Sequence, residues 1–302
     1  MDNTITEVPG IKVGHASDFE AETGCTVILC ERKFQGSCEV RGGAPGTRET
    51  ALLSPQAQMD EIHGVMLTGG SAFGLEAAGG VMDYLEERNI GFDTGVARVP
   101  IVPAGVIFDL AVGNPEVRPD RKMGYKACEK AASDFVTGKA GAGTGATVGK
   151  IRGIENCMRS GVGTASNKRG DLVVGALAVV NAFGDIKDPD TGKIIAGAKD
   201  DNGEFINSEK LFLSEKFGDF AFGENTTLVV VATNASLSKG MNNKMAQMAH
   251  DGMARAIAPV HTMLDGDIVF TLNSSQVKNV DISILGTLAA KTVAEAVVDC
   301  VR

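Results

Sequence analysis

The sequence TTLVVVATNA, residues 226–235, contains a continuous rather than an alternating run of apolar side chains from 227 to 232. Continuous apolarity over so short a run predicts a β-strand that is buried on both faces. A strand with both faces covered needs a packed layer on each side of its sheet, so this stretch predicts a layered fold. Four further β-rich runs are bounded by Gly, Asn or Asp: CTVILC (25–30), GVMLTG (64–69), LVVGALAVVNA (172–182) and DIVFTL (267–272).

Three segments follow the 3.6-residue period of an amphipathic helix, at residues 71–88, 239–257 and 285–301. In the first, Ser71 is available as the N-cap of the helix. In the second, a row of methionines that starts at Met241 is expected to fill core space rather than to bind a ligand. Helices mixed with strands place the chain in the α/β or α+β class with covered sheets.

The composition is that of a compact globular chain and disfavours several classes of partner. Hydrophobic residues make up 43% and charged residues 22% of the 302 residues, so the 38 glycines do not indicate disorder. The formal net charge is -9, no basic run is present and tryptophan is absent, so no nucleic acid partner is expected. A small or polymeric amide, ester or peptide fits better as a ligand. The most polar stretch, residues 185–216, is expected to be a long surface excursion.

The cysteines and the first residues of the sequence indicate a cytoplasmic protein. The six cysteines form no C-x-x-C pair, and the first 30 residues lack a basic start followed by an apolar run. We therefore expect buried thiols in a reducing cytosol. No stretch approaches about 18 uninterrupted apolar residues, so no membrane-spanning helix is expected.

Two glycine-rich motifs match known sites only in part. GAGTGA (141–146) has the spacing of the dinucleotide fingerprint, but it lacks the preceding apolar strand and the following helix. TGGSAFG (68–74) places Ser71 between a strand and a helix, yet Phe73 stands where a nucleophile elbow has its second glycine. Ser71 is more simply an N-cap. The backbone N–H groups of Gly69, Gly70 and Ser71 would still suit an oxyanion or a carboxylate.

The four histidines give no indication of a catalytic or metal site. His15, His63, His250 and His261 are scattered, and no His or Cys cluster has metal-ligand spacing. We therefore expect neither a metal nor a cofactor. A hydrolase of this sequence would have to activate its nucleophile without the usual imidazole.

The pair Asn225–Thr226 stands at the start of the apolar strand and offers such a nucleophile. A threonine hydroxyl can be activated by its own α-amine once that threonine becomes a chain terminus. The α-amine has an ordinary pKa of about 7.7 to 8.0, so it is a usable base near neutrality. On the residues alone, Thr226 is more simply an ordinary threonine that opens a strand.

The segment Asp265-Gly266-Asp267 stands at the entry to the strand DIVFTL. In an extended chain, residues i and i+2 point to the same side, so both carboxylates would face one site. Two close carboxylates shift each other's titration, and one can hold a proton or accept hydrogen bonds from a hydroxyl and an amine. The plain alternative is an Asp-Gly-Asp turn without a function.

Long motifs along nearly the whole chain resemble one family. VRGGAPGTRET, GVMLTGGSAFGLEAAGGVMDYLEE, VPIVPAGVIFDL, GAGTGATVGK, VGTAS and VVGALAVVNAFG follow in order the pattern of the P1-type (DmpA-like) peptidases, the L-aminopeptidase/D-esterase family. The resemblance implies a four-layer αββα sandwich of the N-terminal-nucleophile-like kind (DmpA/ornithine acetyltransferase-like). It also implies a single domain, residues 1–302, that cuts itself between Asn225 and Thr226 into a large chain, 1–225, and a small chain, 226–302.

The resemblance also assigns roles to particular residues. Thr226 matches the nucleophile of self-cleavage and of substrate hydrolysis, and Asn181 matches the side-chain oxyanion donor. Asp265 and Asp267 match the positions that orient the nucleophile, where many aminopeptidases have Ser and Glu. Lys150 falls at or one residue beyond a position that carries Tyr in the aminopeptidases. Thr226, the two aspartates and Lys150 together lean toward the nylon-oligomer hydrolase branch of the family.

The expected function is that of a self-processing amide hydrolase without a cofactor. Its substrate would be a small peptide, an amino-acid amide or an amide oligomer such as a 6-aminohexanoate oligomer. The family also implies a homo-oligomer, usually a tetramer of cleaved protomers. Two alternatives remain open on the sequence: a catalytically silent binding or scaffold protein, and a serine hydrolase built on Ser71.

Overall fold

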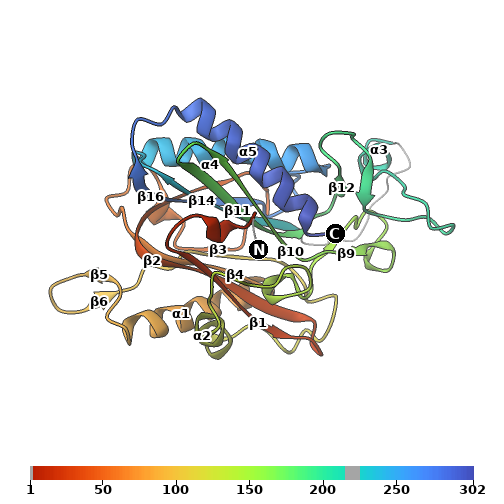
Figure 1. Ribbon diagram of the computed structural model, residues 1–302. Coiled ribbons are helices and arrows are strands. Elements are labelled where there is room, and N and C mark those ends of the chain that lie inside the picture. Colours follow the sequence, from red (N-terminus) through yellow and green to blue (C-terminus); the bar gives the residue numbers. More distant parts are fainter. Residues whose placement is uncertain (1–2, 215–224) are drawn as a thin grey trace.

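The computed structural model describes residues 3–214 and 225–302 of the chain (Figure 1). Its α-helices are α1 (Ala77–Glu86), α2 (Arg121–Glu129), α3 (Ser208–Phe212), α4 (Lys239–Ala256) and α5 (Ile282–Asp299). Its strands are β1 (Ile11–Asp18), β2 (Thr23–Val40), β3 (Thr47–Arg48), β4 (Ile62–Thr68), β5 (Phe92–Asp93), β6 (Arg98–Val99), β7 (Ala104–Val106), β8 (Thr147–Val148), β9 (Met158–Arg159), β10 (Val162–Arg169), β11 (Leu172–Asn181), β12 (Asp185–Lys187), β13 (Ile194–Ala196), β14 (Thr226–Ala235), β15 (Ile257–Ala258) and β16 (Ile268–Val277).

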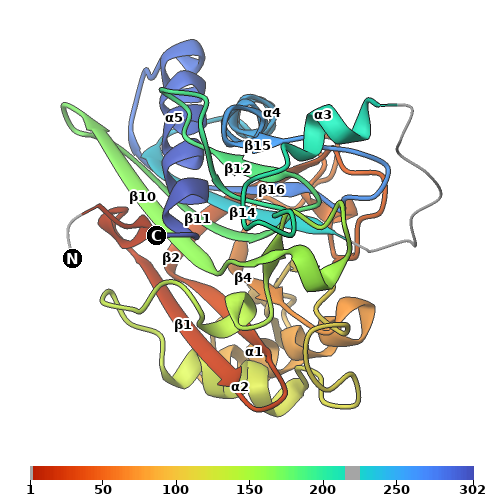
Figure 2. The ribbon, with the colours of Figure 1, turned by 90° about the vertical axis from the view of Figure 1, so that its right-hand side faces the viewer.

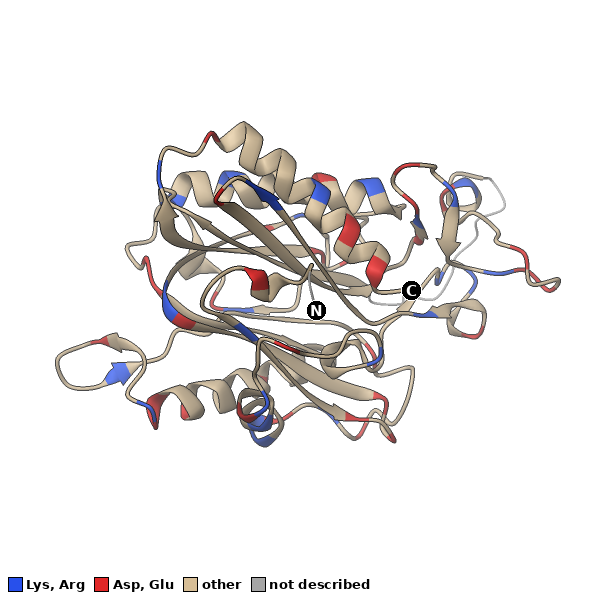
Figure 3. Ribbon diagram, in the orientation of Figure 1, with Lys and Arg blue, Asp and Glu red and all other residues tan. Residues whose placement is uncertain are grey.

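Two β-layers lie face to face between two pairs of helices (Figures 1 and 2). One layer consists of β10, β11, β14, β16 and the C-terminal part of β2, and the other of the N-terminal part of β2 with β1, β4, β7 and β3. Helices α4 and α5 cover the outer face of the first layer, and α1 and α2 cover the outer face of the second. Charged residues lie mainly on the helices, loops and strand ends (Figure 3). The predicted four-layer αββα sandwich is confirmed.

Strand β14 supplies side chains to two separate cores. Leu228, Val230 and Ala232 lie in the core between the two β-layers. Val229 and Val231 lie in the core beneath α4 and α5. Because successive side chains of a strand point to opposite faces, a strand in a middle layer has no position for a polar residue. The continuous apolar run therefore reflects a strand that is buried on both faces, as the sequence predicted.

Strand β2 belongs to both layers and joins them. Its first part pairs with β4, where Cys25 lies opposite Thr68, and its last part pairs with β16, where Val40 lies opposite Ile268. Between the two parts, residues 31–33 are charged and exposed. The strand thus passes from one layer to the other where its side chains can reach water. The sequence run CTVILC predicted only the first of these two parts.

The pairing of β11, β14 and β16 brings three distant segments to one end of the sheet. Asn181, the last residue of β11, lies opposite Thr226, the first residue of β14. Strand β14 runs parallel to β16, with Leu228 opposite Ile268. The end of β11, the start of β14 and the loop before β16 therefore meet, and this loop contains Asp265 and Asp267.

The helix predictions are confirmed in outline and corrected in detail. The segment 71–88 divides into a 3₁₀ helix (Ser71–Glu76) and α1. Ser71 is not the N-cap, because Gly70 occupies that position in a left-handed conformation without a side-chain cap. The methionine row of α4 fills the core only in part, since Met245 is fully buried whereas Met241 is 48% exposed.

A buried carboxylate holds the polar excursion, residues 185–216, together from within. Asp185 in β12 is fully buried and accepts hydrogen bonds from the backbone N–H of Ala198 (3.0 Å) and from the N–H (2.5 Å) and hydroxyl (2.6 Å) of Ser208. Strand β13 and helix α3 lie within this excursion. Its described part is therefore folded rather than a plain surface loop, and residues 215–216 of the predicted excursion lie outside the described residues.

A glycine contact between α4 and α5 allows a direct test of this packing. A Cβ atom built at Gly252 would lie 2.2 Å from the carbonyl oxygen of Ala290, whereas a Cβ at Gly240 on the same helix meets no described residue within 4 Å. We expect Gly252→Ala to lower the free energy of unfolding by about 1 to 3 kcal/mol. Gly240→Ala should raise it by up to about 1 kcal/mol, because alanine is the better helix former. Urea denaturation of both variants measures the difference, and equal effects would contradict the close packing.

Candidate active site

The Asn225–Thr226 peptide is buried and held by hydrogen bonds on its carbonyl group. The two residues are 1% and 4% exposed. The Thr226 hydroxyl donates to the carbonyl oxygen of Asn225 at 2.5 Å, and the backbone N–H of Gly266 donates to the same oxygen at 2.7 Å. The N–H of Asn225 in turn donates to the carbonyl oxygen of Leu264 at 3.0 Å. A hydroxyl and a backbone donor therefore converge on one peptide carbonyl.

The two aspartates lie on either side of Gly266 and hold different parts of the chain. Asp267 accepts the N–H of Thr227 at 2.7 Å. Asp265 accepts the N–H of Phe183 at 3.3 Å and the hydroxyl of Thr262 at 2.5 Å. The carboxylates are thus brought to one site, as the i and i+2 spacing predicts, but neither accepts a hydrogen bond from the Thr226 hydroxyl in this structure.

Burial changes the titration of one of these carboxyl groups. Both aspartates are 1% exposed. Burial, together with the neighbouring Asp267, raises the pKa of Asp265 to about 6, although hydrogen bonds from Thr262 and Phe183 act in the opposite direction. Asp265 is therefore protonated in part of the molecules under mildly acidic conditions.

The backbone of the VRGGAPG motif, residues 40–46, donates hydrogen bonds to the loop that contains Asp265 and Asp267, which we call the acidic loop. The N–H of Gly42 donates to the carbonyl oxygen of Asp267 at 3.2 Å, and the N–H of Ala44 donates to that of Asp265 at 2.9 Å. A Cβ atom at Gly42 would lie 2.3 Å from the Asp265 carbonyl oxygen and 2.3 Å from the Asp267 nitrogen. Only glycine allows the two backbones to approach so closely.

Asn181 lies beside Thr226, and its side chain is fixed by several hydrogen bonds. Its Oδ1 atom accepts from Lys150 Nζ at 2.7 Å and from the N–H of Thr147 at 3.1 Å. Its Nδ2 atom donates to the carbonyl oxygen of Phe108 at 2.9 Å. These partners fix which atom of the amide is oxygen and which is nitrogen. The second N–H of Nδ2 has no partner among the described residues and is available to a ligand.

Lys150 is half-buried, and its amine is held by Asn181. Its Nζ donates to the backbone oxygen of Asn181 at 2.8 Å as well as to Asn181 Oδ1. Burial lowers the pKa of Lys150 to about 7, although Cys157, Asp265 and Asp109 act in the opposite direction. A neutral amine has two N–H groups and one lone pair, and the two acceptors on Asn181 match its two N–H groups. The lone pair of the neutral form then remains free to accept a proton.

The loop Gly69-Gly70-Ser71 does not offer free oxyanion donors in the uncleaved chain. The N–H of Gly69 donates to the Gly24 carbonyl oxygen at 2.9 Å, and that of Ser71 to the Ile107 carbonyl oxygen at 3.0 Å. The N–H of Gly70 donates to Asp109 Oδ1 at 2.7 Å. All three backbone donors are therefore occupied within the protein. A role in binding an oxyanion would require these hydrogen bonds to open.

Asp109 is a buried residue of this region that the sequence did not identify. Its second oxygen accepts the hydroxyl of Thr23 at 2.7 Å, and burial raises its pKa. A Cβ atom at Gly69 would lie 2.0 Å from Asp109 Oδ2, and one at Gly145 would lie 2.6 Å from Asp109 Cβ. Two glycine motifs thus pack around this carboxyl group. In the sequence, Asp109 could have been noticed as the one charged residue in the otherwise apolar run VPIVPAGVIFDL.

Other kinds of site find no support in the part of the chain that the structure describes. The GAGTGA motif forms a buried 3₁₀ turn (Gly141–Gly143) that leads into β8, without the strand and helix of a nucleotide site. In residues 3–214 and 225–302, no three His, Cys, Asp or Glu side chains are grouped as metal ligands. No α-helix in those same ranges combines the length and apolarity needed to cross a membrane.

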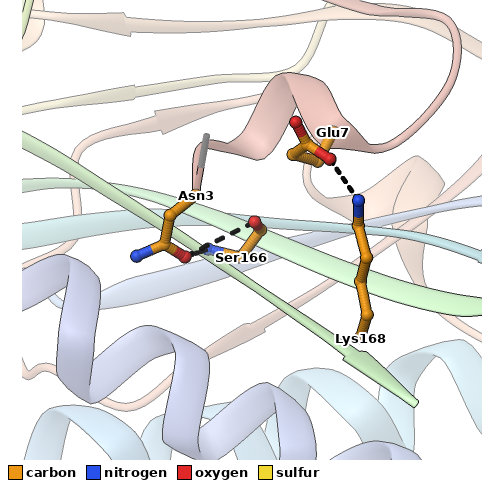
Figure 4. Close-up of a pocket in the computed structure, with 4 residues that line it drawn as sticks. All are labelled: Asn3, Glu7, Ser166 and Lys168. Atoms are coloured by element: carbon orange, nitrogen blue, oxygen red, sulfur yellow. Dashed lines mark hydrogen bonds and ion pairs between the residues drawn. The ribbon is translucent and has the colours of Figure 1, made fainter. Parts of the chain in front are cut away.

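A surface hollow lies away from the candidate active site. Figure 4 shows its lining residues, Asn3, Glu7, Ser166 and Lys168. Ser166 lies opposite Gly175, six residues along β11 from Asn181, which is roughly 20 Å in a strand. The interactions drawn there, between Asn3 and Ser166 and between Glu7 and Lys168, join the N-terminal segment to β10. The hollow is therefore not part of the site at Thr226.

Comparison of the sequence with known families and proteins gives one consistent result. The model of peptidase family S58 matches residues 3–302. An uncharacterized aminopeptidase of Mycobacterium tuberculosis is 43% identical over 294 residues, which cover 91% of this chain and 82% of that protein. A 6-aminohexanoate-oligomer endohydrolase of Paenarthrobacter ureafaciens is 30% identical over 310 residues, which cover 97% of this chain and 84% of that protein.

Comparison of the structure with solved structures supports the fold. An L-aminopeptidase D-Ala-esterase/amidase from Ochrobactrum anthropi, described as a variant of the Ntn hydrolase fold, aligns with a TM-score of 0.74. The alignment covers 99% of this chain and 85% of that one, at 19% sequence identity. The four-layer sandwich is therefore of the N-terminal-nucleophile hydrolase kind, as the resemblance implied.

The desolvated Lys150 predicts a pH-dependent stability difference. Its pKa of about 7 lies below the ordinary value of 10.5, so between these values the unfolded chain binds one more proton than the folded chain. The free energy of unfolding therefore gains from this residue as pH rises across that window, by at most about 1.4 kcal/mol per pH unit. Lys150→Met removes this contribution. Urea denaturation at pH 7, 8 and 9, with both proteins in the same covalent state, measures this. The free energy of unfolding of the parent protein minus that of the variant should increase with pH, and a constant difference would contradict the desolvated amine.

Proposed function

Because the chain belongs to peptidase family S58, we propose that this peptide and amide hydrolase matures by cutting its own Asn225–Thr226 bond. In the mature form, the α-amine of Thr226 would activate the Thr226 hydroxyl to attack the substrate amide. The observation that carries the proposal is the convergence of the Thr226 hydroxyl and the Gly266 N–H on the carbonyl group of Asn225.

In the precursor, Thr226 Oγ1 attacks the carbonyl carbon of Asn225, and its proton passes to a base. The N–H of Gly266 stabilises the negative charge that develops on the carbonyl oxygen. The carbon–nitrogen bond then breaks, the Thr226 nitrogen takes up a proton, and an ester joins the two residues. Water hydrolyses this ester, which leaves a carboxylate at Asn225 and a free α-amine at Thr226.

We assign the role of base in this step to Lys150, because its Nζ is held by Asn181, which lies opposite Thr226 in the sheet. Its neutral form is populated near pH 7, and its two N–H groups have acceptors on Asn181, which leaves its lone pair free. A general base works best when its pKa lies near the working pH. Lys150 also orients Asn181, so the same residue serves the neighbouring oxyanion donor.

In substrate hydrolysis, Asn181 would replace Gly266 as the donor to the oxyanion. One N–H of its Nδ2 is used by Phe108, and the other has no partner in the described part of the chain. Asn181 lies opposite Thr226 in the sheet, which brings its side chain within reach of an acyl group on Thr226 Oγ1. One such donor is typically worth about 3 to 4 kcal/mol in the transition state.

The substrate is proposed as a peptide, an amino-acid amide or an amide oligomer. Relatives carry the names aminopeptidase and 6-aminohexanoate-oligomer endohydrolase, and Thr226, Lys150 and the two aspartates lean toward the second group. Parallel assays of an L-amino-acid p-nitroanilide, a β-alanyl amide and a 6-aminohexanoate oligomer decide between them. No observation favours the silent scaffold or a serine hydrolase built on Ser71.

We also propose that the protein acts in the cytoplasm as a tetramer of cleaved protomers. The six cysteines are all free thiols, four of them buried, which suits a reducing compartment. The oligomeric state rests on the family resemblance alone. Light scattering of the purified protein measures it.

Two adjacent threonines provide a matched test of the nucleophile. Thr226→Val removes the hydroxyl with little change of shape and should abolish self-cleavage and lower amide hydrolysis by about 10⁴-fold or more. Thr227→Val is the control, because the Thr227 hydroxyl is buried, has no hydrogen-bond partner within residues 3–214 and 225–302, and costs little when it is lost. Denaturing gels and amide hydrolysis measure the two effects. An active Thr226→Val protein would exclude Thr226 as the nucleophile.

Gly266→Ala tests the donor on the scissile carbonyl group. A Cβ atom there would lie 2.7 Å from Thr226 Oγ1 and 2.6 Å from the carbonyl oxygen of Ala44, so the loop must shift away from Asn225. We expect self-cleavage to slow by at least about 10-fold, because the N–H of Gly266 moves with the loop. Gel densitometry over time after purification measures the rate. An unchanged rate would show that this donor is not needed.

A further inference from the structure

His261, which the sequence gave no reason to select, lies directly behind Asp267. Its backbone N–H and its Nδ1 atom both contact Asp267 Oδ2, at 3.1 and 2.8 Å. The other oxygen of Asp267 accepts the N–H of Thr227 at 2.7 Å. The carboxylate thus connects the imidazole to the residue that follows the proposed nucleophile.

The backbone of His261 has a conformation that a histidine rarely adopts. Its φ is 56°, in the left-handed region that glycine and asparagine tolerate best. Non-glycine residues in this region cost free energy, and they persist where surrounding contacts hold them. At His261 these contacts are the two hydrogen bonds to Asp267.

The other contacts of the ring do not explain why a histidine is present. The His261 and His250 rings pack edge to face with centroids 4.7 Å apart. His250 is fully buried, and its Nε2 donates to the Glu39 carbonyl oxygen at 2.9 Å. Burial lowers the pKa of His250 to about 4, so it is neutral near pH 7. His261 Nε2 is buried and has no hydrogen-bond partner in the described ranges. An apolar side chain would fill this space without that cost, so the bond from Nδ1 to Asp267 is the distinguishing contact.

We infer that His261 is a positioning residue for self-cleavage, which fixes the Asp267 carboxylate so that it holds Thr227 and keeps the Asn225–Thr226 peptide against Gly266. The effect on self-cleavage rests on the proposed function, whereas the contacts of His261 with Asp267 do not depend on that function. His261 touches none of the reacting atoms. Its effect reaches them through Asp267, whose two oxygens contact His261 and Thr227.

Three substitutions at this position separate the ring from the backbone. His261→Gly accepts the positive φ and removes the donor. His261→Asn accepts the positive φ and places its Nδ2 close to the position of Nδ1. His261→Gln moves the donor outward, to the position of Nε2. A hydrogen bond to a charged group is stronger than most, so we expect self-cleavage to slow by about 10- to 100-fold in the Gly and Gln variants. The Asn variant should stay within about 3-fold of the parent protein.

A second measurement does not require any cleavage. In chains that also carry Thr226→Val, hydrogen exchange of the Thr227 amide reports on its bond to Asp267. We expect His261→Gly to speed this exchange at least about 10-fold and His261→Asn to leave it nearly unchanged. Thermal unfolding of the same chains shows whether a variant has lost its fold as a whole.

The two measurements keep the inference and the proposed function apart. If the parent protein is never cut, the proposed function fails, while the exchange of the Thr227 amide still tests the positioning role. If the Gly and Asn variants cleave at equal rates, or exchange at Thr227 equally fast, the Nδ1 bond has no positioning role and the inference is overturned.

Discussion

The hydrogen bond from the Gly266 N–H to the Asn225 carbonyl oxygen is the contact around which the site is arranged. It requires the acidic loop before β16 and the first residue of β14 to lie side by side, which the parallel pairing of these strands provides. It also requires a glycine, because any side chain at 266 would meet Thr226 Oγ1 and the Ala44 carbonyl oxygen. The fold and Gly266 together place the Asn225–Thr226 peptide bond next to the N–H of Gly266 and the hydroxyl of Thr226.

Burial gives the polar groups around this bond their chemical properties. Asp265 and Lys150 are both moved toward neutrality by desolvation, the first upward in pKa and the second downward. Groups with pKa values of about 6 and about 7 can each take up or release a proton near neutral pH. The nearby His261 acts indirectly, through the carboxylate of Asp267. The sequence expectation that no histidine is the base stays a prediction.

The fold was predictable from the sequence because its signals are local. The continuous apolar run of residues 227–232 and the helical periods of α4 and α5 each reflect which faces are covered. Asn181, Lys150, Thr226 and the two aspartates could be selected as candidate site residues only through the family resemblance, and their roles stay predictions. Asp109 and His261 were missed, since their importance comes from contacts between segments far apart in sequence or from backbone conformation. The oxyanion role expected of residues 69–71 fails in the uncleaved chain, because a motif shows that N–H groups are clustered but not where they are already bonded.

The geometry around Asn225 and Thr226 favours the breaking of one bond, the peptide bond between them. Intact-mass measurement of the freshly folded protein over time, combined with N-terminal sequencing, tests it most directly. We expect the full-length chain to be replaced by residues 1–225 and residues 226–302, with a free amine on Thr226 and a summed mass one water above that of the precursor. A full-length chain that hydrolyses amides without being cut, or a cut at any other bond, would contradict it.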